Sequence, residues 1–193
     1  MRRQSRSKPP TEGSIRIIGG DWRGRKLHFP ITDGLRPTGD RVRETLFNWL
    51  APHIAGARCL DAFAGSGALG LEALSRGAAH CQFLDPQREV TSALQSNLSL
   101  LKAEAGTVTQ ASALEWLSRS VEPFDIVFID PPFDSDLYEP TLKLLLERSL
   151  LADGGWLYLE SARDRQLPMP EGLRLHRDKV AGQTRYQLWQ HSH

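Results

Sequence analysis

The chain of 193 residues is 40% hydrophobic and 24% charged with a net charge of +1, ordinary values for a globular domain with a short extension. No apolar run is long enough to span a membrane, and no apolar segment follows the first basic residues as in a signal peptide, so we expect a cytoplasmic protein. Cys59 and Cys81 lack the spacing of metal ligands. We therefore expect reduced core thiols and no metal site.

Charge is divided unevenly along the chain. Residues 1–43 hold 11 Lys and Arg against 4 Asp and Glu, a net charge of +7, whereas residues 44–193 hold 13 against 19, a net charge of −6. Because Lys and Arg neutralise phosphate groups, the basic segment favours binding to a nucleic acid. The alternative is a basic tail that is only solvated.

The basic segment is predicted to contain a tail and a hairpin. Residues 1–13 are polar and contain prolines, which predicts a disordered basic tail. Residues 14–40 are predicted to form a β-hairpin and a loop, because Gly19-Gly20 separates two apolar runs. We interpret this part as an RNA-binding extension. Its candidate RNA contacts are Arg16, Arg23, Arg25 and Lys26.

A turn around Pro37 leads into the first predicted helix. Thr38 or Asp40 is placed to cap this helix, whose apolar positions recur at helical spacing. We assign residues 41–193 to the catalytic domain. The candidate RNA contacts near this turn are Arg36, Thr38, Arg41 and Arg43.

From residue 58 onward, strand and helix patterns alternate. Strands are expected at 59–63, 79–84, 107–110, 124–129 and 156–160, and helices at 68–76, 87–101, 114–120 and 137–150. This alternation predicts an α/β fold with a doubly wound, Rossmann-like and mostly parallel sheet. Residues 173–180 and 184–189 have no helix between them, which predicts a hairpin that adds an antiparallel strand at the sheet edge.

A glycine-rich turn, Gly65 to Gly70, joins the first of these strands to its helix. Such a turn lets a ligand approach the backbone and the unpaired N–H groups of the helix N-terminus. Asp61, at the strand end, would repel a pyrophosphate but could pair with an amino or cationic ligand, which favours S-adenosylmethionine. An NAD-dependent oxidoreductase would explain the glycines but not Asp61. The alternative for Asp61 is a helix or loop cap.

Two later positions also suit a nucleoside-like cofactor. Asp85 ends the second strand, where an acid typically binds ribose hydroxyls, although before Pro86 it could also cap the next helix. Ser112 could approach an adenine edge or could cap a helix. The candidate cofactor-binding residues are Asp61, Phe63, Ala64, Gly65, Ser66, Gly67, Asp85, Pro86, Ser112 and Ala113.

Asp130-Pro131-Pro132-Phe133 follows the buried strand predicted at 124–129. The prolines lack N–H donors and hold the chain extended, so the Asp130 carboxylate and nearby carbonyl groups act as acceptors. Acceptors suit an NH₂ group, and Phe133 offers a face on which a nucleobase could stack. These four residues are the candidate catalytic residues. The alternative for Asp130 is a turn acid that caps the next helix.

Four sets of residues resemble the bacterial 16S ribosomal RNA guanine-N2 methyltransferase family. They are Arg16 to Gly20 with Trp22 to Leu27, Arg36 to Thr38 with Asp40 to Glu44, Asp61 to Gly67, and Asp130 to Phe133. The resemblance covers nearly the whole chain after residue 13. It implies a seven-stranded class I methyltransferase fold, S-adenosylmethionine as donor with S-adenosylhomocysteine as product, and one guanine of 16S rRNA as target. It further implies an RNA presented within a partly or fully assembled small subunit, and we expect a monomer with no membrane partner.

The resemblance and the residues together give a mechanistic hypothesis. Asp130 and the Pro131 carbonyl would accept hydrogen bonds from the exocyclic amine of guanine, and Phe133 would stack on the base. Two other functions stay open. A DNA adenine or cytosine amino-methyltransferase uses a similar signature, although Asp at position 130 and the lack of a target-recognition domain disfavour it. A non-catalytic ribosome assembly factor is the second alternative.

Overall fold

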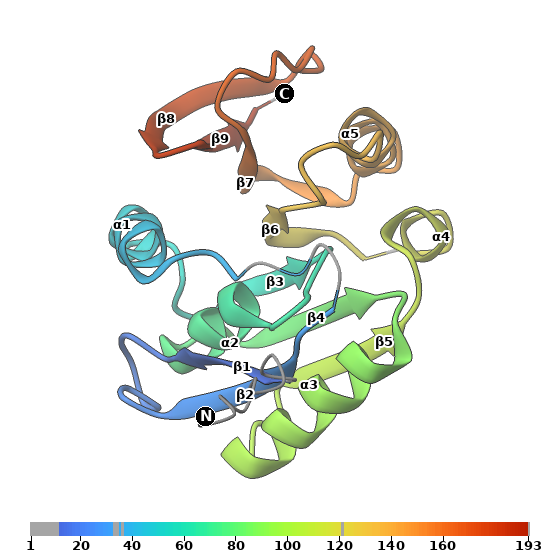
Figure 1. The fold of residues 1–193 in the computed structure, drawn as a ribbon. Helices are drawn as coiled ribbons and strands as arrows, with labels where there is room; N and C mark the ends of the chain where they lie inside the picture. The colour runs from blue at the N-terminus through green and yellow to red at the C-terminus, as the bar shows by residue number, and fades with distance from the viewer. Residues whose placement is uncertain (1–11, 33–34, 36, 121, 193) are drawn as a thin grey trace, which may run out of the picture.

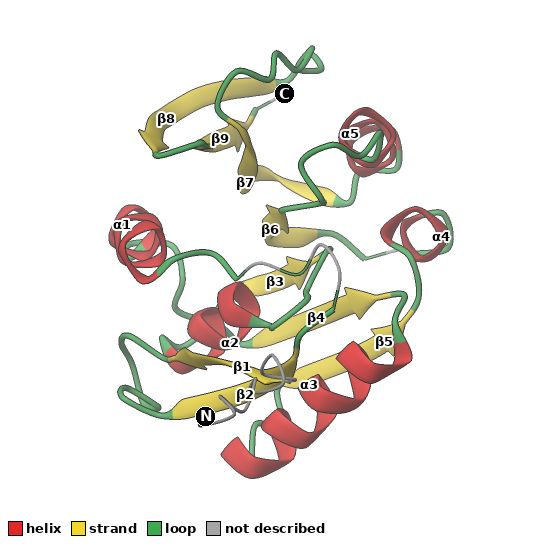
Figure 2. Ribbon diagram, in the orientation of Figure 1, coloured by secondary structure: helices red, strands yellow, loops and turns green. Residues whose placement is uncertain are grey.

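The computed structural model describes residues 12–32, 35, 37–120 and 122–192. A seven-stranded sheet lies between two layers of helices (Figures 1 and 2). Its strands are β3 (Arg58–Asp61), β4 (His80–Asp85), β5 (Gly106–Gln110), β6 (Phe124–Ile129), β7 (Leu151–Ala162), β8 (Leu173–Ala181) and β9 (Thr184–His191). Of the tail predicted at residues 1–13, only residues 12 and 13 belong to the described part of the chain.

The strand order is β5-β4-β3-β6-β7-β9-β8. Strands β3 to β7 pair in parallel, and β9 pairs antiparallel with both β7 and β8. The predicted mostly parallel sheet with an antiparallel edge is thus confirmed. Because β3 lies between β4 and β6, the strand order reverses there, and open α/β sheets form their ligand crevice at the carboxyl ends of such strands.

Helices cover both faces of the sheet. One face packs against α1 (Asp40–Leu50), α2 (Ala68–Ser75) and α3 (Arg88–Leu101), and the other against α4 (Ala113–Leu117) and α5 (Tyr138–Glu147). Side chains alternate along the strands, so Cys59 and Leu60 enter opposite cores. Both cysteines are buried and free. Within the described ranges, none of the helices combines the length and apolarity needed for a membrane span.

The N-terminal hairpin consists of β1 (Glu12–Arg16) and β2 (Lys26–Pro30), so it begins two residues before the predicted start. Ile15 and Leu27 enter the same core as α2 and α3. The amide of Asn97 on α3 donates a hydrogen bond of 2.9 Å to the His28 carbonyl. Figure 1 shows the hairpin lying beside these helices. One face of the hairpin is therefore packed against the body of the protein.

Strand β7 is longer than predicted. Its pairing with β6 begins at Leu151, and the register jumps from Phe124 opposite Leu151 to Ile126 opposite Trp156. Gly154 has φ 75°, a left-handed conformation that glycine adopts without strain. Gly154-Gly155 forms the irregularity inside the strand, so β7 begins at Leu151, five residues before the predicted start at 156.

Candidate active site

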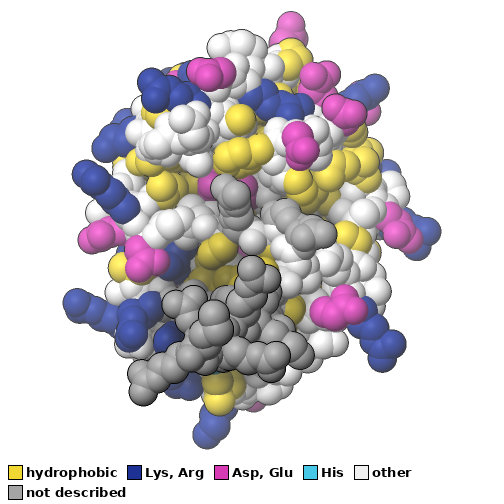
Figure 3. Space-filling model, viewed as in Figure 1, with side chains coloured by type: hydrophobic (Ala, Val, Ile, Leu, Met, Phe, Trp, Pro, Cys, Tyr) yellow, Lys and Arg dark blue, Asp and Glu magenta, His cyan; other side chains and the backbone are white. Residues whose placement is uncertain are grey.

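A cavity of about 790 Å³ opens at the carboxyl ends of β3, β4 and β6. It brings together residues that lie far apart in the sequence. The candidate residues that line it are Thr38, Asp61, Phe63, Ala64, Gly65, Ser66, Asp85, Pro86, Ser112, Ala113, Asp130, Pro131, Pro132 and Phe133. Gly67 is not among the lining residues; it precedes α2 with φ 78° and forms the helix N-cap. Figure 3 shows hydrophobic side chains in the middle of this view of the molecule and Lys and Arg side chains around its margin.

Asp61 connects the cavity to the N-terminus of α2. Its Oδ2 accepts a hydrogen bond of 3.0 Å from the Gly70 N–H. One carboxylate oxygen of Asp61 thus bonds to the first turn of the helix, as expected if Asp61 caps it. The side chain also lines the cavity and is only 2% exposed. Burial, opposed by this hydrogen bond and aided by the charge of Asp85, raises the pKa of Asp61 to about 7. A cationic group in the cavity would favour the ionised form.

Asp85 fixes the glycine-rich turn. Its Oδ1 accepts from the Gln87 N–H at 2.9 Å, and its Oδ2 accepts from the Gly65 N–H at 3.2 Å. Gln87, not Asp85, occupies the N-cap of α3, so the capping alternative for Asp85 is wrong. Burial raises the pKa of Asp85 despite both hydrogen bonds. The turn and the candidate ribose-binding acid are thus held in one rigid unit.

Ser112 occupies the N-cap of α4. Its hydroxyl oxygen accepts a hydrogen bond of 3.2 Å from the Glu115 N–H. This is the helix-capping alternative, and it satisfies one of the free N–H groups of the first turn. Ser112 and Ala113 nevertheless line the cavity, so the first turn of this short helix borders it.

Asp130 directly follows β6 and faces the cavity. The Thr38 hydroxyl lies 3.3 Å from its Oδ2. Burial, reinforced by the negative charge of Glu160, raises the pKa of Asp130 well above its usual range. Phe133, also on the cavity wall, has its carbonyl oxygen fixed by a 2.7 Å hydrogen bond from Arg165. The arrangement presents oxygen acceptors and an aromatic ring to the same space.

Comparisons with known proteins identify the family of this chain. The family model described as "Conserved hypothetical protein 95" matches residues 15–190. The chain is 54% identical over 179 residues to "Ribosomal RNA small subunit methyltransferase D" of Escherichia coli strain K12, covering 92% of this chain and 90% of the relative. It is 46% identical to the Haemophilus influenzae protein of the same name, covering 94% and 96%. The chain belongs to the small subunit methyltransferase D family.

The fold leads to the same result. The solved structure of the Escherichia coli protein yhhF, described as a methyltransferase candidate, superposes with a TM-score of 0.86 at 52% identity. That match covers 93% of this chain and 99% of the other. The family resemblance noted in the sequence, the class I methyltransferase fold and the assignment as a methyltransferase enzyme are therefore confirmed.

Glu160 is a member of this site that the sequence pattern did not single out. It lies on β7, lines the cavity and is 6% exposed. Its Oε2 accepts hydrogen bonds from the Thr38 hydroxyl at 2.9 Å and from the Tyr158 hydroxyl at 2.8 Å. The available signal was an acid inside an apolar strand, since a carboxylate is rarely buried without a partner.

Thr38 and Asp40 do not cap α1, contrary to the prediction. Gly39 is the N-cap residue, and no side chain bonds to the first turn there. Thr38 instead points its hydroxyl to the acids of the cavity, and Asp40 accepts a hydrogen bond from Arg43. The side chain of Thr38, before α1, therefore contacts the acids of the cavity and does not cap the helix.

The predicted RNA contact of Arg43 is wrong. Its side chain is 1% exposed and forms a buried ion pair with Glu72 at 3.4 Å. Its guanidinium also donates to the carbonyl oxygens of Thr38 and Arg16, each at 3.1 Å. A charge that the sequence pattern assigned to the surface thus ties the hairpin, α1 and α2 together. Arg36 lies outside the described residues, and Arg41 is exposed.

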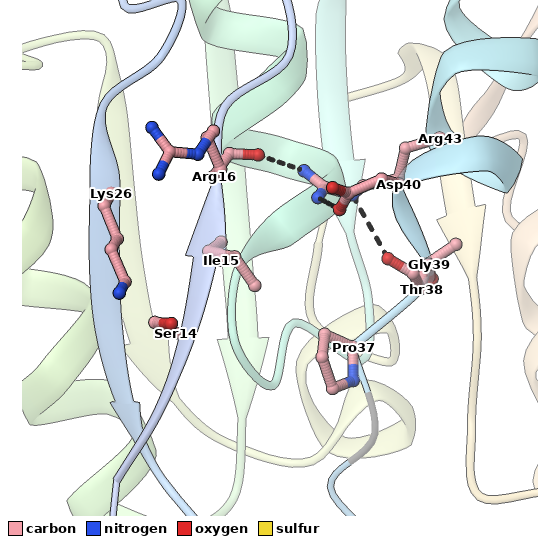
Figure 4. Close-up of a pocket in the computed structure, with 9 residues that line it drawn as sticks. All are labelled: Ser14, Ile15, Arg16, Lys26, Pro37, Thr38, Gly39, Asp40 and Arg43. Carbon is pink, nitrogen blue, oxygen red and sulfur yellow. Dashed lines mark hydrogen bonds and ion pairs between the residues drawn. The ribbon is translucent and has the colours of Figure 1, made fainter.

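A second cavity of about 330 Å³ lies between the hairpin and the segment before α1 (Figure 4). Arg16 and Lys26 extend from neighbouring strands on one side, and Gly39 and Asp40 lie opposite. Residues 37–39 line both cavities and therefore separate them. Arg23 and Arg25 are exposed in the hairpin turn. Among the residues that the structure describes, no group of His, Cys, Asp and Glu side chains is placed to hold a metal ion.

Proposed function

We propose that this methyltransferase transfers a methyl group from S-adenosylmethionine to the exocyclic N2 amine of one guanine in 16S rRNA. The observation that carries the proposal is the position of Asp130: it shares one cavity with the glycine-rich turn and the acids Asp61 and Asp85. The names of the relatives support ribosomal RNA of the small subunit as the substrate class.

The cavity suits S-adenosylmethionine. Its volume of about 790 Å³ falls within the range typical of small-molecule sites. Asp61 would pair with the ammonium group of the methionine moiety, Asp85 would bind the ribose hydroxyls, and Ser112 with Ala113 would border the adenine. When bound, the cofactor supplies a methyl group on a positively charged sulfur. The chain's own residues bind and orient it, and no metal is required.

The acceptors around Asp130 favour guanine among bases with an amine. Guanine has a ring N–H donor beside its NH₂ group, whereas adenine and cytosine have a ring acceptor there. The Asp130 carboxylate and the Pro131 carbonyl accept hydrogen bonds, and the two prolines provide no N–H donor. The Tyr138 hydroxyl lies 3.5 Å from the Pro131 oxygen, which keeps a second lone pair for the amine. Phe133 would stack on the flipped base.

The hairpin would guide the RNA backbone to this cavity. We propose that residues 14–40 act as the RNA-binding extension of a catalytic domain formed by residues 41–193. Arg16 and Lys26 border the second cavity, and the segment 37–39 lines both this cavity and the first. A phosphate bound there would lie next to the nucleotide in the catalytic cavity. Further contacts are assigned to Arg23, Arg25, Arg36 and Arg41.

Neutralising the hairpin cations should weaken RNA binding and its dependence on salt. In a protein with Arg16→Gln and Lys26→Gln, the slope of log affinity against log salt should flatten by roughly one unit per lost phosphate contact. Fluorescence anisotropy with a 16S rRNA fragment at several salt concentrations measures this slope. Lys143→Gln on α5, over the other face of the sheet, is the matched control. An unchanged slope in the double variant would rule out contacts of Arg16 and Lys26 with RNA phosphates.

Methyl transfer from tritiated S-adenosylmethionine tests the proposed function. The assay compares naked 16S rRNA, small-subunit particles and plasmid DNA as acceptors. Label in small-subunit RNA is the expected result, and we propose a partly or fully assembled subunit as the physiological substrate of a monomeric cytoplasmic enzyme. Label in DNA alone would support the DNA amino-methyltransferase, and label in neither would support the non-catalytic assembly factor.

A further inference from the structure

A buried hydroxyl joins Asp130 to a second carboxyl group. Thr38 Oγ1 lies 2.9 Å from Oε2 of Glu160 and 3.3 Å from Oδ2 of Asp130. The three residues come from the segment before α1, from β7 and from the end of β6, so the fold itself creates this contact. All three line the catalytic cavity. The same Glu160 oxygen also accepts a hydrogen bond from Tyr158.

The number of hydrogens limits what this cluster can do. A hydroxyl group has one hydrogen to donate, so Thr38 cannot donate fully to two carboxylates. The shorter distance assigns the hydrogen to Glu160, which also receives one from Tyr158. The contact with Asp130 is then satisfied when Asp130 carries a proton and donates it to Thr38 Oγ1. With Glu160 ionised, the cluster is therefore suited to hold a proton on Asp130 once the Asp130 carboxylate has accepted one.

We propose that Thr38 and Glu160 are positioning residues that prepare Asp130 to take up the proton released by the methylated amine. The inference rests on the proposed function. In the reaction, an N–C bond forms as the C–S bond of the donor breaks and leaves its electron pair on sulfur. One N–H bond then breaks, its electron pair stays on nitrogen, and the proton passes to the Asp130 carboxylate. Protonated Asp130 donates to Thr38, and the charge of Glu160 stabilises that proton.

The surroundings of Asp130 make the effect of Glu160 measurable. Asp61 on β3 and Glu160 on β7 face it with negative charge, Thr38 with a hydroxyl, and Tyr138 on α5 with a phenol. Burial and these two charges raise the pKa of Asp130. The hydroxyl of Tyr158 completes the group through Glu160. Removal of the charge of Glu160 should therefore lower the pKa of Asp130.

The test is the pH profile of kcat/KM for methyl transfer to small-subunit RNA. Asp130 must be ionised to accept the amine proton, so activity falls as the pH falls through its pKa. Glu160→Gln keeps the shape but removes the charge, and it should move this acid limb to lower pH by about one unit while lowering kcat. Glu147→Gln, on the exposed side of α5, should leave the profile unchanged.

A second pair of variants separates the hydroxyl from packing. Thr38→Val should lower kcat by roughly tenfold, and Thr38→Ser, which restores a hydroxyl, should recover most of it. Binding of S-adenosylhomocysteine and thermal unfolding show that each variant is folded. An acid limb that does not move in Glu160→Gln, or a Thr38→Ser protein as slow as Thr38→Val, would overturn the inference. Wild-type protein that labels no RNA at any pH would overturn the proposed function and with it the inference.

Discussion

The substitution Asp130→Asn should lower kcat by about 10²- to 10⁴-fold, the range typical of a lost general base. Asn has nearly the same shape, but it cannot accept the amine proton and adds an N–H donor where the site needs acceptors. Affinity for S-adenosylhomocysteine should change little, because Asp61, Asp85 and Ser112 are intact. Single-turnover methyl transfer with saturating RNA measures the effect directly.

The same substitution should not destabilise the fold. Burial raises the pKa of Asp130, so the folded state holds a proton that the unfolded chain loses at lower pH. The stability contributed by this group is present at low pH and is lost as the pH rises through the folded pKa. At neutral pH, Asn should leave the thermal midpoint equal or higher. Asp136→Asn, an exposed neighbour, is the control for activity. Near-normal turnover in folded Asp130→Asn would refute the catalytic assignment.

Arg43→Met should lower the unfolding free energy of the protein by about 3 kcal/mol, because it leaves a buried charge without one partner. Glu72 is 0% exposed. In this variant Glu72 would keep its ion pair with Arg76 at 2.9 Å and its hydrogen bonds from the N–H groups of Ile18 and Gly19. These remaining partners keep the expected loss of stability at the lower end of the range for broken buried ion pairs. Urea unfolding at neutral pH measures the change.

Two further variants separate the ion pair from the loss of packing. Arg41→Met changes an exposed arginine of the same helix and should leave the urea midpoint unchanged. Adding Glu72→Gln to Arg43→Met should recover part of the lost stability, because the buried charge that has lost its Arg43 partner is then removed. A single Arg43→Met variant as stable as the wild type would show that the pair does not hold the hairpin to the body.

The sequence predicts those parts of the fold and the site that depend on neighbouring residues. The turn at Gly65 follows a strand and precedes a helix, and Asp130 directly follows an apolar run. Both positions can therefore be predicted from the residues next to them in the sequence. The order of strands and helices follows from their alternation in the same way. These patterns place the candidate residues at one sheet edge because parallel strands share their carboxyl ends.

The sequence does not predict contacts between distant segments. Glu160 reaches Thr38 across 122 positions; an acid inside an apolar strand indicates that Glu160 needs a partner, but the local sequence does not show which residue it is. Arg43 was predicted to contact RNA because it lies in the basic segment, but its guanidinium pairs instead with the buried Glu72 on α2. Gly154-Gly155 has the composition of a turn, and only the pairing of Leu151 and Trp156, on either side of it, with β6 shows that it lies within a strand.

Nucleoside mass spectrometry of 16S rRNA tests the central claim most directly. Unmodified small-subunit RNA is incubated with the protein and S-adenosylmethionine, digested, and compared with a reaction containing Asp130→Asn, and primer extension maps the position. The account predicts one N2-methylguanosine at a single site with the wild-type protein and almost none with the variant. Methylation of a different base, or of a guanine ring nitrogen, would contradict the assignment of Asp130 and Pro131 as acceptors for the exocyclic amine.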